Sequence, residues 1–338
     1  MIIRVILAAV AVGVTAIWPR ARLSAAAVLG VGAVSALVAG GGVAGDAVRA
    51  TAPMLVFLTA ALGVAALAER AGLSAWAAGK LAALGRGRTR RLYALVCLAS
   101  GLLTCLVSLD GAVVLMVPVV RALARRCRVS FAPFFLGAVA VANAASLAVP
   151  LGNPTNLVVM STLGLSPGSF LHHLFVPGLC AAVVCALVPA RRLGRRHYVV
   201  RPAVSEEPVP MLLVPWRIGA QLTGLVAALD GLVPSLALRS GGLAALLAVA
   251  AGAAAASALA NNLPVSASVA ALATPGPGAY AALVGLTVGA LATPHGSVAT
   301  LIARDLAGQQ AGRRWARLWV PATAVAVTLA TLLLWASF

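Results

Sequence analysis

Apolar blocks separated by short polar stretches cover most of this 338-residue chain. The blocks are 2–18, 24–40, 51–68, 92–123, 132–163, 172–189, 211–234, 241–273, 278–302 and 318–335. A helix rises about 1.5 Å per residue, so about 20 residues cross a hydrocarbon core of about 30 Å, and most blocks have roughly that length. The pattern therefore predicts an all-α integral membrane protein.

Three blocks exceed 30 residues and are too long for one straight crossing. Of these, 132–163 is interpreted as a single broken crossing, which leaves 92–123 and 241–273. We interpret each as a re-entrant hairpin, which enters and leaves the bilayer by the same face. Eight full crossings then remain, and both termini are predicted to lie outside the cell. The first hairpin opens to the cytoplasm and the second to the outside, which predicts an inverted repeat of the kind found in secondary transporters.

The distribution of charge supports this topology. The chain has 25 Lys and Arg but only seven Asp and Glu, and a net charge of +18 would also suit a nucleic-acid partner. In the predicted topology, however, only Arg4, Arg49 and Arg239 lie outside, and the other 22 basic residues lie on the cytoplasmic side. This bias is typical of membrane proteins. We therefore predict a multi-pass protein of the plasma (inner) membrane that contacts lipid headgroups and binds no nucleic acid.

Neither the first block nor the cysteines change this interpretation. The segment 1–18 has a weakly basic start and is followed by another apolar block, so we interpret it as a transmembrane helix and not as a signal peptide. The five cysteines show no CxxC spacing and are interpreted as small apolar residues. We expect no metal site and no cofactor.

Four polar clusters interrupt the longest apolar blocks. The two hairpins have polar tips at 108–111 and 261–264, and two further blocks contain the clusters 150–156 and 293–297. Gly and Pro unwind a helix, and unwound backbone at membrane depth occurs only where it is buried in protein or lines an aqueous cavity. We predict that the four breaks converge near the bilayer midplane on a binding site. The alternative is that their Asn and Ser side chains only join helices.

The polar stretch 190–210, which contains three prolines, is predicted to link two halves of the chain. We divide the chain into scaffold helices (1–91), a first hairpin and broken helix (92–163), a closing helix and cytoplasmic linker (164–210), a scaffold helix (211–240), a second hairpin and broken helix (241–305) and a C-terminal helix (306–338).

Asp110 is the only acidic residue at the centre of an apolar block in the first half. A carboxylate at that depth costs about 2.5–3.5 kcal/mol on insertion scales, and such residues usually carry a proton or an ion. We predict that Asp110 couples transport to protons; the alternative is a cap on a helix that starts at Gly111. His295, in the second broken block, either titrates in the site or only forms neutral hydrogen bonds. Asp230 lies near the outer end of its span, and we expect no functional role for it.

Six motifs spread over most of the chain resemble the ion transporter superfamily, most closely its arsenite and antimonite efflux permeases. GNPTNLVV at 152–159 is common across that superfamily, which also includes the divalent anion:sodium symporters. Each motif is short, but together they are specific. The other five are the segment 68–73 with Trp76, SLDGAVVLMVPVV at 108–120, VPWRIGAQLTGLVAALDGLV at 214–233, NNLP at 261–264 and TPHGSVATL at 293–301.

The resemblance implies that the two segments with a hairpin and a broken helix, 92–163 and 241–305, form a transport domain that moves against a scaffold. It also implies a homodimer and an accessory ATPase subunit as candidate partners. Three departures matter. Leu109 replaces an asparagine of the first tip, which favours proton coupling through Asp110 over a sodium site. His295 replaces an apolar residue, and the second half lacks two scaffold helices. The residues implied to line the site are Ser108, Asp110, Asn153, Thr155 and Asn156 on one side, and Asn261, Asn262, His295, Gly296 and Ser297 on the other.

These features predict a proton-coupled secondary transporter that exports arsenite or antimonite, and not an enzyme. Arsenite is a neutral trihydroxide at neutral pH, so Asn, Ser and Thr can bind it without a basic side chain. The alternatives on the same fold are sodium/proton antiport, transport of a dicarboxylate-type anion, or a non-transporting receptor or assembly subunit. An intramembrane enzyme would need clustered groups such as Ser with His or paired aspartates, and the sequence shows no such cluster at membrane depth.

Overall fold

The computed structural model describes residues 2–17, 22–40, 42–194, 197–200, 215–230, 242–308 and 315–338. This part of the chain is helical, without a strand beyond one isolated bridge between Arg88 and His197. The α-helices are α1 (Ile2–Ile17), α2 (Arg22–Ala39), α3 (Val43–Arg70), α4 (Leu73–Gly85), α5 (Thr89–Val107), α6 (Leu109–Cys127), α7 (Phe131–Ala145), α8 (Pro154–Leu163), α9 (Pro167–Ala190), α10 (Trp216–Leu229), α11 (Leu243–Ala260), α12 (Asn262–Leu272), α13 (Pro277–Gly289), α14 (Val298–Ala307) and α15 (Trp315–Trp335). Three short 3₁₀ helices, η1 (Ser146–Ala148), η2 (Pro150–Gly152) and η3 (Ala290–Ala292), follow α7 and α13.

Six helical segments of the described chain are long and apolar enough to cross a membrane. They are Val43–Arg70, Thr89–Val107, Phe131–Ala148, Pro167–Ala190, Leu243–Ala260 and Arg317–Trp335. Large apolar side chains such as Leu37, Val56 and Leu106 lie on the outer surface with most of their area exposed. An apolar surface of this kind is stable in lipid, so the prediction of an all-α, multi-pass membrane protein is confirmed.

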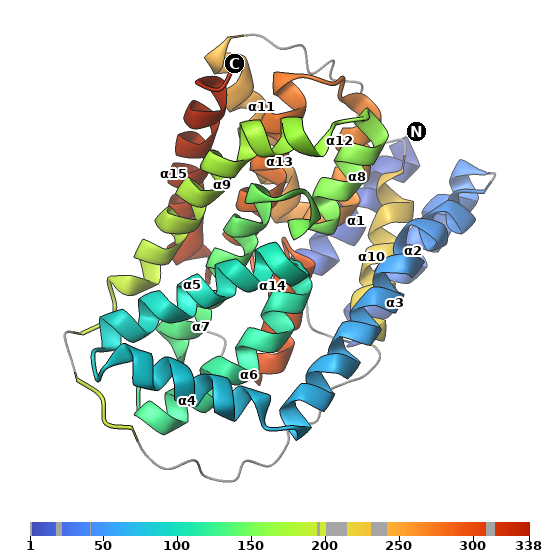
Figure 1. Ribbon diagram of the computed structural model, residues 1–338. Coiled ribbons are helices and arrows are strands. Elements are labelled where there is room, and N and C mark those ends of the chain that lie inside the picture. Colours follow the sequence, from blue (N-terminus) through green and yellow to red (C-terminus); the bar gives the residue numbers. More distant parts are fainter. Residues whose placement is uncertain are drawn as a thin grey trace.

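Helices α1, α2, α3 and α10 form a bundle along one edge of the molecule, on the right in Figure 1. Gly32 of α2 and Gly224 of α10 bring two backbones into contact, because a Cβ on Gly32 would lie 2.4 Å from the carbonyl oxygen of Gly224. The hydroxyl oxygens of Thr51 in α3 and Thr223 in α10 are 2.9 Å apart. Small residues and hydroxyl pairs of this kind are typical of helix contacts in membranes. We call these four helices the scaffold bundle.

The remaining helices form a second and larger body around two helix pairs, α5–α6 and α11–α12. Each pair is broken at one residue, Ser108 or Asn261, which has a positive φ of 121° or 74°. The same packing occurs in both halves of the chain: α5 packs on α7 as α11 packs on α13, while α6 packs on α14 as α12 packs on α8. The second helix of each pair therefore contacts a half-helix from the other half of the chain.

An apolar cluster joins the scaffold bundle to this larger body. Leu58 and Leu62 of α3 and Leu222 of α10 pack against Val114 of α6 and Leu301 of α14. All five side chains are buried. The contact therefore depends on apolar packing between α3 and α10 on one side and α6 and α14 on the other.

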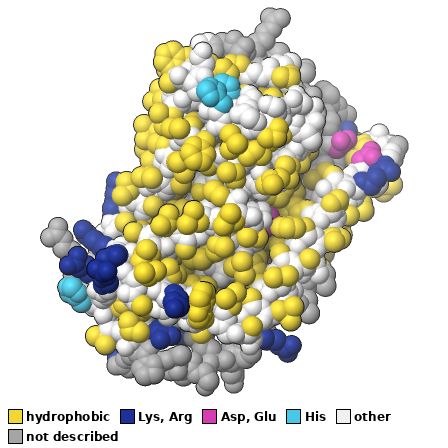
Figure 2. Space-filling model, in the orientation of Figure 1, with side chains coloured by type: hydrophobic (Ala, Val, Ile, Leu, Met, Phe, Trp, Pro, Cys, Tyr) yellow, Lys and Arg dark blue, Asp and Glu magenta, His cyan; other side chains and the backbone are white. Residues whose placement is uncertain are grey.

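Lys and Arg side chains gather at the lower end of the molecule in Figure 2, whereas Figure 1 places the N- and C-terminal ends at the upper end. The lower end includes α4, which matches none of the apolar blocks. Glu69, at the end of α3, accepts a hydrogen bond from the hydroxyl of Ser74 in α4. The chain therefore has one strongly basic end, as the distribution of Arg along the sequence predicts.

Candidate functional site

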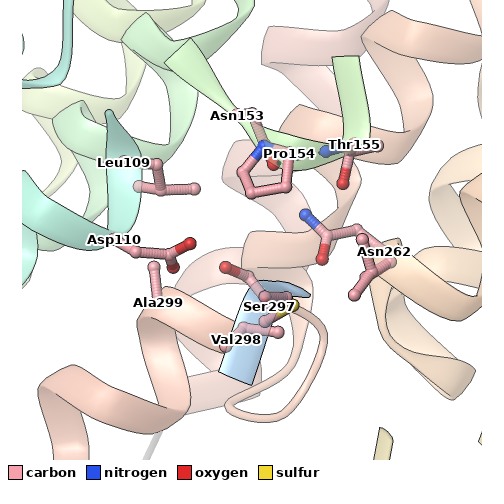
Figure 3. A pocket seen from close by; sticks show the side chains of 11 residues that line it. Leu109, Asp110, Asn153, Pro154, Thr155, Asn262, Ser297, Val298 and Ala299 are labelled. Carbon is pink, nitrogen blue, oxygen red and sulfur yellow. Dashed lines mark hydrogen bonds between the residues drawn. The ribbon is translucent and has the colours of Figure 1, made fainter. Parts of the chain in front are cut away.

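A cavity lies where the two helix tips and the two broken spans meet (Figure 3). It is narrow, with a volume of about 10 Å³. Its lining comes from both tips, from both breaks and, through Met54, from the scaffold bundle. The lining residues are Met54, Leu109, Asp110, Asn153, Pro154, Thr155, Asn262, Leu263, Ser297, Val298 and Ala299. The structure thus brings together four segments that are far apart in sequence.

The first tip is made by Ser108, which ends α5 and begins α6. The Ser108 hydroxyl accepts a hydrogen bond of 3.4 Å from the backbone N–H of Gly111, so Ser108 is the N-cap of α6. The alternative interpretation of Asp110 as a cap is therefore wrong. Asp110 lies in the first turn of α6, its side chain is 3% exposed, and Figure 3 shows its carboxylate pointing into the cavity.

The first broken span passes from α7 through η1 and η2 to α8. The Asn153 side chain accepts a 3.0 Å hydrogen bond from the N–H of Thr155, and Pro154 has no N–H to satisfy. The Asn156 amide donates to the carbonyls of Ser146, at 2.8 Å, and Val149, at 3.1 Å. Asn156 thereby satisfies carbonyl groups that the unwound backbone leaves without helical partners.

The second tip and the second broken span are bonded to each other. The Asn261 side chain accepts a 3.2 Å hydrogen bond from the N–H of Leu263 and donates one of 2.8 Å to the carbonyl of His295. The N–H of Asn262 donates to the carbonyl of Gly296 at 2.8 Å. The His295 Nε2 lies 3.3 Å from the carbonyl oxygen of Leu259. These bonds hold the second break against the second tip and leave the Asn262 side chain facing the cavity.

The structure divides the ten residues implied by the family resemblance into two equal groups. Asp110, Asn153, Thr155, Asn262 and Ser297 line the cavity. The other five lie directly behind it, where they cap helices or bind unwound backbone: Ser108, Asn156, Asn261, His295 and Gly296.

Several polar groups at the cavity have no partner within the described chain. The buried hydroxyls of Thr155 and Ser297 form no hydrogen bond, and the Asp110 carboxylate forms neither a hydrogen bond nor an ion pair with a described residue. The backbone N–H groups of Val298, Ala299 and Thr300, in the first turn of α14, are also without acceptors among the described residues. Unpaired buried polar groups destabilise a protein unless a ligand or water satisfies them.

The electrostatics of the cavity combine one carboxylate with four helix N-termini. Helices α6, α8, α12 and α14 all begin at its lining, and a helix N-terminus carries a partial positive charge and free N–H groups. None of the lining residues is basic, and Asp110 is the one acidic residue among them. The site can therefore donate hydrogen bonds to oxygen atoms and, through Asp110, accept a proton, a cation or a hydroxyl hydrogen.

Sequence patterns missed two contributors to the site. Met54 comes from α3, and nothing in its apolar surroundings distinguishes it from other core residues. Asn143 of α7 is fully buried behind the cavity, and its amide nitrogen lies 3.5 Å from the hydroxyl oxygen of Thr300. An asparagine within the apolar block 132–163 is a signal that could have identified this second residue.

Broken helices that meet at a polar cavity inside an all-α membrane protein define a membrane transporter. The chain belongs to the citrate transporter family, CitMHS, which matches it over residues 2–220. This match covers α1, α2 and α3 of the scaffold bundle, the first tip and the first broken span, and it confirms the resemblance to the ion transporter superfamily.

Three curated proteins match shorter segments. The 46 kDa membrane protein of Mycobacterium leprae (strain TN) is 31% identical over 117 residues, which cover 34% of this chain and 27% of that protein. The “Putative transporter arsB” of Dictyostelium discoideum is 28% identical over 96 residues, 28% of this chain and 17% of its own length. The inner membrane protein YbiR of Escherichia coli (strain K12) is 33% identical over 85 residues, 25% of this chain and 23% of its own. The chain thus spans about a quarter or less of the length of each relative.

Proposed function

We propose that this chain is a proton-coupled secondary transporter that exports arsenite or antimonite across the plasma membrane. The observation that carries the proposal is the cavity itself, where unpartnered hydrogen-bond donors from α14 and Thr155 face one unpartnered carboxylate. The name of the Dictyostelium relative, a transporter called arsB, supports the substrate class. The name of the Escherichia coli relative supports an inner-membrane location.

The chemistry of arsenite matches this arrangement. Each of its three hydroxyl groups can donate one hydrogen bond and accept others. The free N–H groups of Val298 and Ala299 and the hydroxyl of Ser297 would donate to its oxygens, while the carboxylate of Asp110 and the amide oxygen of Asn262 would accept from its hydroxyls. The small cavity and its lack of a basic side chain favour a small neutral solute.

Asp110 supports the coupling to protons. An ionised carboxylate that is 3% exposed and has no counter-charge among the described residues is costly in a low-dielectric site. A proton that binds Asp110 removes this cost, so the occupied and empty states of the site differ in proton content. Moving one charge through 100 mV supplies about 2.3 kcal/mol, enough to drive export against a gradient.

The arrangement of the two bodies supports an elevator-like movement. The scaffold bundle contacts the larger body through the apolar cluster around Leu58, Leu222 and Leu301. Apolar side chains can slide past one another without breaking directional bonds, whereas the second tip and the second break are hydrogen-bonded to each other and would move together. The cavity would then pass from one side of the membrane to the other as a unit.

A second candidate is transport of a carboxylate-type anion. The observations in its favour are the description of the matched family as a citrate transporter and the four helix N-termini that begin at the cavity. Free N–H groups at a helix N-terminus bind carboxylate oxygens well. Asp110 would then have to be neutralised by a proton or a cation when the anion binds.

Uptake into everted membrane vesicles separates the two candidates. Vesicles that contain the protein are given arsenite or citrate, with and without an inside-acid proton gradient, beside vesicles without the protein. Gradient-driven arsenite accumulation supports the first proposal, and its absence together with citrate transport supports the second. If neither solute is transported and sodium addition instead dissipates the proton gradient, the protein is a cation antiporter and both proposals are wrong.

A further inference from the structure

A second pocket lies between α5 and α9, away from the cavity at the helix breaks. Its volume is about 660 Å³. The pocket is lined by Arg90, Tyr93, Ala94 and Cys97 of α5 and by Ala186, Leu187, Ala190, Arg191 and Leu193 at the end of α9 and beyond it. The Tyr93 hydroxyl donates a 2.6 Å hydrogen bond to the carbonyl of Ala186, which fixes the two helices side by side.

Two guanidinium groups contribute to this pocket without a partner. Arg90 lies in the first turn of α5, Arg191 directly follows α9, and both side chains are exposed. Neither forms a hydrogen bond or an ion pair with any residue that the structure describes. Of the five acidic residues that the structure describes, none lines the pocket: Asp46, Glu69, Asp110, Asp230 and Asp305.

The rest of the lining is mostly apolar. Ala94 and Leu187 are exposed on the outer face of α5 and α9, where both helices are apolar enough to cross a membrane. One group of Lys and Arg side chains in Figure 2 lies over the beginning of α5 and the end of α9. The pocket thus presents positive charge at the level where a helix leaves the hydrocarbon and an apolar wall at the level of the acyl chains.

We propose that this pocket binds an anionic phospholipid. The phosphate is held between Arg90 and Arg191, and an acyl chain lies along Ala94 and Leu187. Guanidinium groups bind phosphate oxygens in a bidentate manner, and basic pockets between membrane helices are suited to anionic headgroups. An acyl chain covers the apolar wall and shields it from water at the membrane interface, whereas a free phosphate ion cannot.

The charge requirement is tested by native mass spectrometry of the full-length protein in detergent, with phosphatidylglycerol, phosphatidylcholine or inorganic phosphate added. We expect phosphatidylglycerol to bind more tightly than phosphatidylcholine, and inorganic phosphate alone not to compete for the site. The double variant Arg90→Gln/Arg191→Gln should bind phosphatidylglycerol roughly 25-fold more weakly, because each basic residue near an anionic lipid contributes about a factor of five. The matched control is Arg88→Gln/Arg192→Gln, which removes two exposed charges from the same end of the molecule but none from the pocket.

The acyl-chain requirement is tested with Ala94→Phe, which fills the apolar wall and keeps both arginines. We expect it to weaken phosphatidylglycerol binding while the unfolding temperature in lipid-free detergent stays unchanged. Equal binding of phosphatidylcholine, or equal loss in the Arg90/Arg191 and Arg88/Arg192 variants, would overturn the proposal. Competition by inorganic phosphate, or full binding by Ala94→Phe, would show an anion site without a lipid and would overturn it as well.

Discussion

The two broken spans reach the same cavity, and each has a glycine against the carbonyl at the start of a 3₁₀ helix. A Cβ on Gly152 would lie 2.5 Å from the carbonyl oxygen of Ser146, and one on Gly296 would lie 2.3 Å from that of Ala290. Beyond this point the two spans differ. In the first span, side chains of the chain itself form hydrogen bonds with the backbone groups at the break. In the second span, the backbone N–H groups at the start of α14 have no such partner within the described chain.

The difference lies in the residues that begin α8 and α14. Asn153 caps α8 by accepting from the N–H of Thr155, while the Ser297 hydroxyl caps nothing and leaves three N–H groups of α14 unpartnered within the described chain. A capped helix start is stable without a ligand, but an uncapped and buried one is not. Under the proposed function, the first break would provide a rigid wall, and the start of α14, on which the helix of Asp110 packs, would provide most of the donors for a solute.

The largest expected effect comes from removing the one charge of the cavity. Asp110→Asn keeps the size of the side chain but cannot exchange a proton, so gradient-driven solute accumulation in everted vesicles should fall to the background level. The matched control is Asp230→Asn. Asp230 lies outside the cavity, and its carboxylate oxygen is 3.7 Å from a guanidinium nitrogen of Arg4. If Asp110→Asn still accumulates solute in response to a proton gradient, Asp110 is not the coupling group.

Each break contains a glycine packed closely against backbone, so replacing either glycine should cause a similar loss of stability. Gly152→Ala and Gly296→Ala each place a methyl group against backbone that cannot move aside, and each should lower the free energy of unfolding by about 2–3 kcal/mol. Denaturant titration of the purified protein measures this loss. Gly252→Ala in α11 is the control, because nothing lies within 4 Å of its Cβ. A loss in one break only would show that the two spans are not built alike.

The uncapped start of α14 predicts that the Ser297 hydroxyl contributes to solute binding. Ser297→Ala removes an unpartnered hydroxyl from the cavity and should raise the KM for the transported solute about 3- to 10-fold, the range expected for one hydrogen bond. Ser266→Ala is the control, because its buried hydroxyl donates to the carbonyl of Leu263 within its own helix, 2.7 Å away. An unchanged KM for Ser297→Ala would place the solute away from α14.

The smallest expected effect is a difference in stability between variants of the capped helix start, in α8, and of the uncapped one, in α14. Asn153→Ala removes the cap of α8 and should lower the free energy of unfolding by about 1 kcal/mol. Ser297→Ala should not lower it, because Ser297 forms no cap bond and its buried hydroxyl has no partner among the described residues. Thermal unfolding of the two variants side by side measures the contrast, and equal losses would contradict the assignment of one closed and one open break.

The positions of the breaks are predictable from the sequence because polar, Gly and Pro residues are rare inside apolar blocks. The helices end or begin at Ser108, Asn153, Asn261 and Ser297, all of which lie within the four predicted clusters. The helix α4, in contrast, has no corresponding apolar block, because it lies among the basic residues at one end of the molecule. The sequence also does not predict that Met54 lines the cavity, because this depends on how the scaffold bundle packs against α14.

The sequence by itself determined that this is a membrane protein with broken helices, because length and hydropathy decide which segments are stable in lipid and where they unwind. Only the tertiary structure decided which polar residue of each cluster faces the cavity. Asn153 and Asn156 are three positions apart, yet Asn153 lines the cavity while Asn156 turns to the carbonyls of Ser146 and Val149. The physical reason is that unwound backbone must be satisfied inside the protein, and the choice of side chain for that task depends on which carbonyl groups the fold brings within reach.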